Sequence, residues 1–263
     1  MILAPSTIVF IHGILHLAMD NAILWGLVSQ NVTTLASLPR VSQVEQRALT
    51  REEANKLVEA ARGTRLETLL ILALTTAMRR GELLGLRWDD IDFKHKTLQV
   101  RRSLGYIRKH GFVISEPKTK TSRRKIMLTD FAIEALKKHR SLQDERRGKS
   151  PSWTDMNLVF CNIHGGYWMP EHMVTMFHKL LEKAQLPRIR FHDLRHSAAT
   201  LLLAMGVHPK IVQNLLGHSK ISTTMDTYSH VLPSMQKEIV DKMGLVFKQE
   251  DEMEGLGTEE DAP

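Results

Sequence analysis

The chain has almost no cysteine and few aromatic residues. Its 263 residues include a single cysteine, Cys161, and three tyrosines, and aromatic residues make up 6% of the total. One cysteine cannot form an internal disulfide or a cysteine-based zinc site, which indicates a reducing, cytoplasmic compartment. Because 43% of the residues are apolar but few are aromatic, we expect an aliphatic, largely helical core in one large or two modest domains.

Basic residues are missing from the end of the chain. From Glu250 onward there are seven acidic residues and no lysine or arginine, whereas the whole chain carries +7, so the preceding residues carry +14. A body this basic favours a polyanionic partner, nucleic acid before an anionic membrane. A soluble surface with excess lysine is the alternative. We expect the tail, residues 249–263, to be disordered.

The apolar N-terminal stretch lacks the features of a signal peptide or a membrane span. "IVFIHGILHLAMDNAILWGLV" has no positive region before it and no small-residue cleavage site. Asp20 and Asn21 would lie near the centre of a span. His12, His16 and Asp20 instead follow a spacing of four, which places them on one polar stripe of a helix. We expect an amphipathic helix of a soluble protein over residues 5–29.

Helical patterns dominate the rest of the chain. Thr50 to Glu53 reads as a capping box for a helix that ends near Ala61, and "TRLETLLILALTTA" is apolar enough to be a buried helix. Three runs, "TLQVRRS", "GFVIS" and "RKIML", predict a small antiparallel sheet. Further helices are expected over residues 130–139, 170–184, 192–204, 209–216 and 233–245, with a charged loop over 141–156. The predicted fold class is therefore mainly α with a small antiparallel β-sheet.

Two motifs contain an arginine in a position that suits an anionic partner. In "FHDLRHSAATLLLAMG", His192 and Arg195 share a face near a helix N-terminus, where free N–H groups favour anions. In "TTAMRRGELLGLRW", Arg79 follows a buried helix and needs either a partner or a cleft. A capped amphipathic helix and a helix-end salt bridge from Arg79 to Glu82 are the alternatives.

A metal site at the histidines is a weaker possibility. His192 and His196 have the i, i+4 spacing of metal ligands, but no third ligand is obvious in the sequence. We expect no metal and no cofactor.

The segment around the predicted sheet is densely basic. Nine lysines or arginines and one acid, Glu116, lie between Arg101 and Lys125. "PKTKTS" predicts a β-turn that would present Lys118 and Lys120 at its tip. This charge density indicates phosphate contact, with an ordinary solvated hairpin as the alternative. The predicted DNA contacts are Arg101, Arg102, Lys120, Arg123 and Arg124.

The polar segment "LGHSKISTTMDTYSH" contains His218 and Tyr228. A phenol has a pKa of about 10, so it is a poor nucleophile near pH 7 unless cations or a base surround it. Two arginines, a lysine and two histidines would supply that environment.

Taken together, these motifs resemble the catalytic set of the tyrosine recombinases, and the chain is similar to integrases of temperate phages and conjugative transposons. The resemblance covers roughly residues 5–248, and six residues match in order: Arg79, Lys118, His192, Arg195, His218 and Tyr228.

The resemblance implies a role for each of the six. Tyr228 would attack the scissile phosphate and become a 3′-phosphotyrosine, while Arg79 and Arg195 hold the non-bridging oxygens. Lys118, or Lys120 close by, would protonate the leaving 5′-oxygen. His192 would act as acid/base or phosphate ligand, and His218 would hydrogen-bond the phosphate. The implied partners are double-stranded DNA and three further copies, in a homotetramer formed by exchange of the helix at 233–245.

The resemblance also implies a domain arrangement. Residues 1–38 would be the C-terminal part of a helical core-binding domain, 39–48 a linker, 49–248 the catalytic domain and 249–263 the tail. The resemblance therefore implies that the chain is truncated at its N-terminus relative to the family. A truncated or decayed integrase that only binds DNA is the alternative function, and a metal-dependent nuclease is a third.

Overall fold

The computed structural model describes residues 3–41, 47–116 and 123–217. Contacts between residues divide the chain into two compact units, Met1–Gln46 and Arg47–Pro263. The division falls inside the predicted linker at residues 39–48. The assignment of these units to a core-binding and a catalytic domain stays a prediction.

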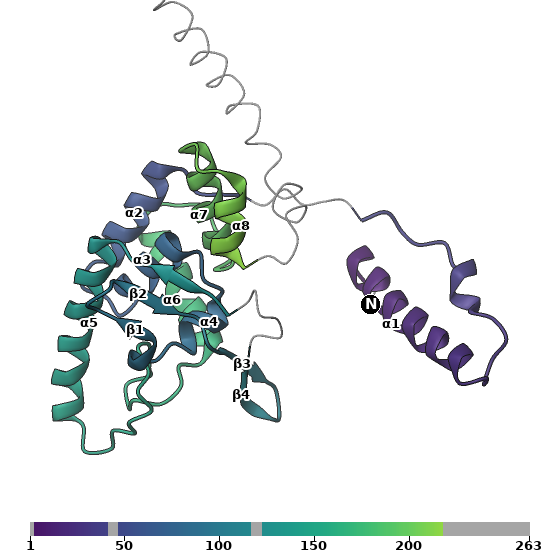
Figure 1. Cartoon of the computed structure of the whole chain (residues 1–263), viewed down its shortest axis with the longest axis horizontal. Coiled ribbons are helices and arrows are strands. Elements are labelled where there is room, and N and C mark those ends of the chain that lie inside the picture. Colours follow the sequence, from purple (N-terminus) through teal and green to yellow (C-terminus); the bar gives the residue numbers. More distant parts are fainter. Residues whose placement is uncertain (1–2, 42–46, 117–122, 218–263) are drawn as a thin grey trace, which may run out of the picture. The chain divides into compact units, whose positions relative to one another are not determined.

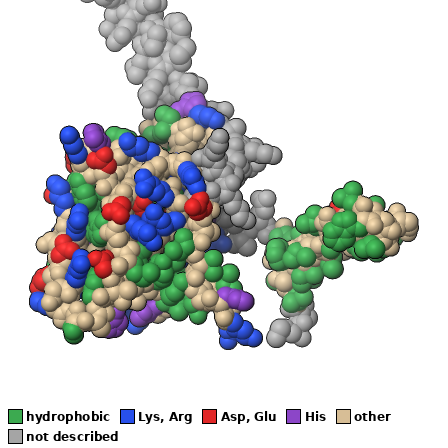
Figure 2. All heavy atoms as spheres, turned by 60° about the horizontal axis from the view of Figure 1, so that its bottom comes forward, with side chains coloured by type: hydrophobic (Ala, Val, Ile, Leu, Met, Phe, Trp, Pro, Cys, Tyr) green, Lys and Arg blue, Asp and Glu red, His purple; other side chains and the backbone are tan. Residues whose placement is uncertain are grey.

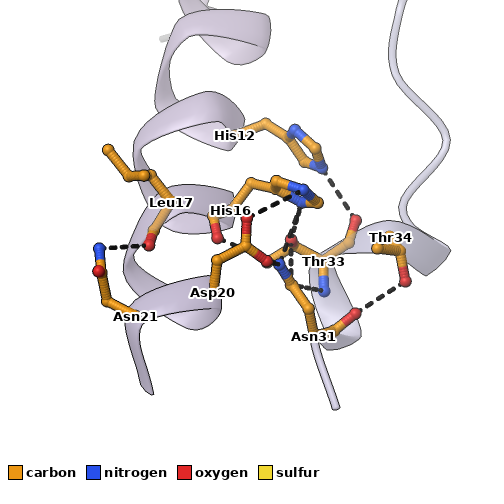
Figure 3. Close-up of polar contacts among 8 residues, drawn as sticks. All are labelled: His12, His16, Leu17, Asp20, Asn21, Asn31, Thr33 and Thr34. Atoms are coloured by element: carbon orange, nitrogen blue, oxygen red, sulfur yellow. Dashed lines mark hydrogen bonds and ion pairs between the residues drawn. The ribbon is translucent and has the colours of Figure 1, made fainter. Parts of the chain in front are cut away.

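The smaller unit consists of helix α1 (Pro5–Leu24) and a short 3-10 helix, η1 (Val32–Leu35). The predicted polar stripe of α1 faces η1 (Figure 3). His12 donates through Nε2 to the Thr33 carbonyl over 2.9 Å, and Asn31 donates to Asp20 over 2.6 Å. The helix ends at Leu24 rather than residue 29, because Gly26 adopts a left-handed conformation with φ of 69°.

The apolar side chains of α1 remain exposed in this unit, and none of the helix is buried. By length and composition, α1 is the one helix among the described residues that could cross a membrane. A signal sequence or a core helix of a soluble protein meets the same criterion, so this property assigns no location.

The larger unit is mostly helical, which confirms the predicted fold class. Its helices are α2 (Arg51–Ala61), α3 (Glu67–Thr76), α4 (Arg80–Leu84), η2 (Trp88–Asp90), α5 (Asp130–Lys149), α6 (Pro170–Lys183), α7 (Asp193–Ala204) and α8 (Pro209–Leu216). The apolar α3 packs against α2, α4, α5 and α7 and lies in the middle of the unit (Figure 1). Its side chains from Leu69 to Ala73 are almost fully buried, as the sequence predicted.

The strands in the described part of the chain form two sheets rather than the one predicted. β1 (Ile91–Asp92), β2 (Thr97–Gln99) and β5 (Lys125–Met127) make an antiparallel sheet in the order β1-β2-β5. Among the described residues, β3 (Ser103–Ile107) and β4 (Gly111–Ser115) pair only with each other, and they project from the body (Figure 1). A local turn explains the split, because Lys109 and Gly111 both adopt positive φ and close β3 onto β4.

The charged segment after His139 is helical, so the predicted loop over residues 141–156 was wrong for its first half. α5 continues to Lys149. Gln143 is buried there and bridges the Trp88 indole to the Leu158 carbonyl. Arg146, Arg147 and Lys149 occupy the last turn, where positive charge complements the helix dipole. Tertiary contacts and good helix formers therefore extend the helix beyond its apolar stripe.

Candidate active site

The first arginine motif lies where α3 gives way to α4. Ala77 ends α3 in a left-handed conformation, with φ of 51°, and Arg79 is the N-cap of α4. The backbone N–H and Nη1 of Arg79 both donate to Glu82, over 2.9 and 2.8 Å. The predicted helix-end salt bridge is thus present, and it leaves the Arg79 side chain 39% exposed.

Close packing holds α4 against β3. Gly81 lies so near β3 that a Cβ there would be 2.8 Å from the Leu104 carbonyl oxygen and 2.4 Å from Ser103 Oγ. No side chain fits at that distance without movement of the backbone. Glycine at this position therefore fixes the placement of Arg79 relative to the sheet.

The second arginine motif opens α7. Arg195 is only 3% exposed. Its Nη1 donates to the carbonyl of Ala77 over 2.8 Å, and its Nη2 donates to the carbonyl of Leu216 at the end of α8. Arg195 thus ties together two segments that flank the Arg79 motif and the "LGH" motif.

His192 and Arg79 line the same cleft, which has a volume of about 600 Å³. Its other described lining residues are Arg80, Gly81, Ser103, Leu104, Val174, His178, Arg190 and Phe191. Besides the predicted pair, three of these ten residues are Arg or His. The sequence analysis missed Arg80, His178 and Arg190, although the double arginine at 79–80 was visible as a signal.

The electrostatics at the start of α7 favour the neutral form of two histidines, His192 and His196. Partial burial and the positive charge of Arg195 lower the pKa of His192. Burial and the neighbouring His192 lower the pKa of His196 to about 4, and the two rings stack edge to face at 5.2 Å. The lowered pKa favours the neutral form of His192, whose ring can accept a proton.

Asp193 is the first residue of α7, and Arg190 binds its carboxylate. Arg190 donates to its carboxylate through the backbone N–H and through the guanidinium, the latter over 2.8 Å. Burial alone would raise the pKa of Asp193, but the hydrogen bonds and charge of Arg190 outweigh burial and lower it. In the described part of the chain no group of three or more His, Cys, Asp or Glu could hold a metal ion.

The predicted DNA contacts differ in exposure. Arg101 and Arg123 are about half exposed. Arg102 is 18% exposed and donates to the buried Asp90. Arg124 is 7% exposed and donates to Glu82 and to the Leu215 carbonyl. Direct DNA contact by these residues stays a prediction, and the burial of Arg124 favours a structural role for its side chain.

Four predicted site residues lie outside the described residues: Lys118, Lys120, His218 and Tyr228. The described structure therefore brings together Arg79, His192 and Arg195, and it ends at Gly217, directly before His218. The helix expected over residues 233–245 also lies outside it.

The chain is similar to several known proteins. The model of the phage integrase family matches residues 47–235. A XerC-like tyrosine recombinase of Caldanaerobacter subterraneus is 37% identical over 208 residues, which are 74% of this chain and 53% of the relative. The ICEBs1 integrase of Bacillus subtilis is 30% identical, over 67% of this chain and 48% of the relative. The chain thus spans about half the length of these two relatives.

Two solved structures share the fold. The Tn1549 transposon integrase, in complex with a circular intermediate DNA, matches with a TM-score of 0.75 and 23% identity, over 91% of this chain and 80% of that one. XerA recombinase matches with a TM-score of 0.60 and 24% identity, over 78% and 67%. The extent of the family match, together with the residues in the cleft, leads to one conclusion: the chain belongs to the phage integrase family, as the resemblance of its motifs predicted.

Proposed function

We propose that this protein is a site-specific recombinase that cuts and rejoins double-stranded DNA for the integration or excision of a mobile element. The observation that carries the proposal is the link between the two arginine motifs. Arg195, 116 residues after Arg79, donates to the carbonyl of Ala77, two residues before Arg79. Two guanidinium groups and the His192 ring are thereby held on one frame beside a cleft, an arrangement suited to a phosphodiester.

The chemistry needs neither metal nor ATP. Tyr228 gives its phenolic proton to the neutral His192 ring and attacks the scissile phosphorus through Oη. A new P–O bond to tyrosine forms, and the bond to the 5′-oxygen breaks. The leaving oxygen takes a proton from Lys118, or from Lys120 in its place. The phosphotyrosine ester conserves the energy of the broken bond, so a second 5′-hydroxyl can attack it and release Tyr228. Arg79 and Arg195 neutralise charge that grows on the non-bridging oxygens, and His192 and His218 complete the phosphate contacts.

Binding to DNA is supported by the distribution of charge. Figure 2 shows one face of the larger unit on which many lysine and arginine side chains, with some Asp and Glu among them, lie beside an apolar area. Arg108 and Lys109 are exposed at the tip of the β3–β4 hairpin. The homologue structures in complex with DNA have the same fold. We extend the proposal to a cytoplasmic protein that forms a homotetramer on DNA through residues 233–245.

A covalent trap tests the proposal. The probe is a pool of nicked duplexes with randomised sequence around the scissile linkage, so that cleavage releases a short strand and leaves the protein attached. Wild-type protein should form an adduct that survives denaturation, without divalent metal and in the presence of a chelator. Tyr228→Phe should bind the pool equally and form no adduct. An adduct from the Phe variant would overturn the role of Tyr228, and binding without any wild-type adduct would favour a protein that only binds DNA.

A further inference from the structure

Arg124 occupies a buried position between three elements that are distant in the sequence. It immediately precedes β5, and its side chain is 7% exposed. Its Nη1 and Nη2 donate to the two carboxylate oxygens of Glu82, over 3.2 and 2.9 Å. Its Nε donates to the carbonyl of Leu215 in α8 over 2.7 Å. All three nitrogens of the guanidinium therefore have partners, in α4 and α8.

The carboxylate that binds Arg124 is the one that holds Arg79. Glu82 accepts from the Arg79 N–H on one oxygen and from Arg79 Nη1 on the other. Burial would raise the pKa of Glu82, but its hydrogen bonds to Arg124 and the charges of both arginines outweigh burial and lower the pKa. Glu82 is thus an anion shared by one buried and one half-exposed arginine. Its position, and with it that of Arg79, depends on Arg124.

The second contact of Arg124 reaches the other half of the site. The last carbonyls of a helix have no partner within the helix. In α8, the Leu215 carbonyl accepts from Arg124 and the Leu216 carbonyl accepts from Arg195. Two guanidinium groups therefore hold the end of α8, directly before Gly217. Arg124 contacts both the partner of Arg79 and the helix end that Arg195 also holds.

We infer that Arg124 is a positioning residue. Through Glu82 it orients the Arg79 side chain relative to Arg195 and the end of α8. The inference rests on the proposed function, because it assigns to Arg124 the alignment of a phosphate clamp. Arginine is required here since one planar group must serve a carboxylate and a carbonyl at once. A lysine ammonium carries its donors on a single atom and cannot reproduce this fork.

The test compares cleavage of two linkages by the full chain. The pool of nicked duplexes described above is prepared with either a phosphate or a methylphosphonate at the scissile position. A methylphosphonate lacks one charged non-bridging oxygen, so its cleavage depends less on a guanidinium clamp. Arg124→Lys should slow adduct formation on phosphate about 10-fold and Arg124→Met about 100-fold, the scale of losing one preorganised donor. On methylphosphonate both losses should shrink to a few-fold, as they should for Arg79→Ala.

Arg65→Lys is the control for a partly buried arginine outside the cleft. Arg65 donates to the Cys161 carbonyl over 2.5 Å and packs over Trp168, so its replacement perturbs folding without touching the cleft. It should leave the ratio of the two cleavage rates at the wild-type value, whatever it does to the melting temperature.

A double variant separates positioning from stability. Arg124→Met alone leaves the buried Glu82 with one partner fewer, whereas Glu82→Gln combined with Arg124→Met removes the buried ion pair and should recover much of the lost stability. Cleavage of phosphate should stay low in the double variant. Wild-type rates in Arg124→Lys, equal losses on both linkages, or recovery of cleavage together with stability would each overturn the inference. No wild-type adduct on either linkage would overturn the proposed function and this inference with it.

Discussion

Replacing Arg195 with lysine should damage both stability and cleavage, and the structure allows the two effects to be estimated separately. Nη1 and Nη2 of Arg195 donate to the carbonyls of Ala77 and Leu216. Both acceptor residues are fully buried. A lysine reaches one carbonyl and leaves the other without a donor.

An unsatisfied buried polar group costs about 1–3 kcal/mol. In a domain of this size, 1 kcal/mol corresponds to a shift of roughly 2–4 °C in melting temperature. We therefore expect Arg195→Lys to melt about 2–12 °C below wild type, and Arg195→Ala, which leaves both carbonyls unpaired, to melt lower still. Cleavage should fall at least ~100-fold in either variant because one preorganised donor to the phosphate is lost.

Two assays read the two effects. Thermal melting is followed by circular dichroism, and adduct formation is measured on the nicked duplex pool well below the melting temperature of the variant. Arg62→Lys is the control for a generic loss of arginine, since Arg62 pairs with Glu59 at the surface and is 71% exposed. That change should stay within about 0.5 kcal/mol of wild type. If Arg195→Lys melts and cleaves like wild type, the arginine neither holds the two carbonyls nor clamps the phosphate.

Three other predictions concern the packing of α4 against β3, the titration of His196 and the binding of DNA. Gly81→Ala should destabilise the protein by about 1–3 kcal/mol because its Cβ would overlap Leu104, whereas Gly148→Ala, with open space around it in α5, should be neutral or stabilising by up to about 1 kcal/mol; equal urea midpoints for the two variants would contradict the close approach. The pKa of His196 is lowered in the folded state to about 4, so the unfolded chain takes up the proton at a higher pH than the folded protein does. The contribution of His196 to the free energy of unfolding should therefore be at its maximum above pH 6.5 and should decrease as the pH falls toward 4. His196→Gln should flatten that decrease in urea titrations across this range, and an unchanged slope would assign it to other groups. Arg123→Gln should weaken DNA binding for all sequences and reduce the slope of log K against log salt by about 1; fluorescence anisotropy measures this, and an unaltered slope would place Arg123 away from the phosphates.

The sequence predicted those parts of the fold that hydrophobic period and capping residues determine. The buried helix α3 and the helices that begin at Pro170 and Pro209 lie where expected. The capping box from Thr50 to Glu53 forms with both of its hydrogen bonds. These features are local, and a single sequence contains the residues that cause them.

Errors arose where distant contacts decide the structure. α5 runs past its apolar stripe because Gln143 is held by Trp88, 55 residues earlier. The single predicted sheet splits because residues 103–107 turn back at once and pair with 111–115. Neither outcome follows from residue type alone.

The sequence around Arg124 contains a second signal, which the prediction from composition did not use. Arg124 lies in a basic stretch, which suggested DNA contact, but the alternation of the strand places it on the same side as Ile126 and Leu128. Both of these are buried, whereas Lys125 and Met127 between them are exposed. The period of two thus contained the signal for the burial of Arg124, and the prediction from charge density did not use it.

The least predictable part of the site is the set of backbone acceptors. Arg195 binds the carbonyls of Ala77 and Leu216, and each lies at the C-terminal end of a helix that finishes in a left-handed residue, Ala77 itself or Gly217. A glycine in the sequence often indicates such a helix end. An alanine rarely does, because its Cβ makes the left-handed conformation energetically costly. Every residue has a backbone carbonyl, so residue type does not indicate which carbonyl will accept a hydrogen bond from a side chain. The guanidinium groups of the site could therefore be found from motifs, but the frame that orients them could be found only from the fold.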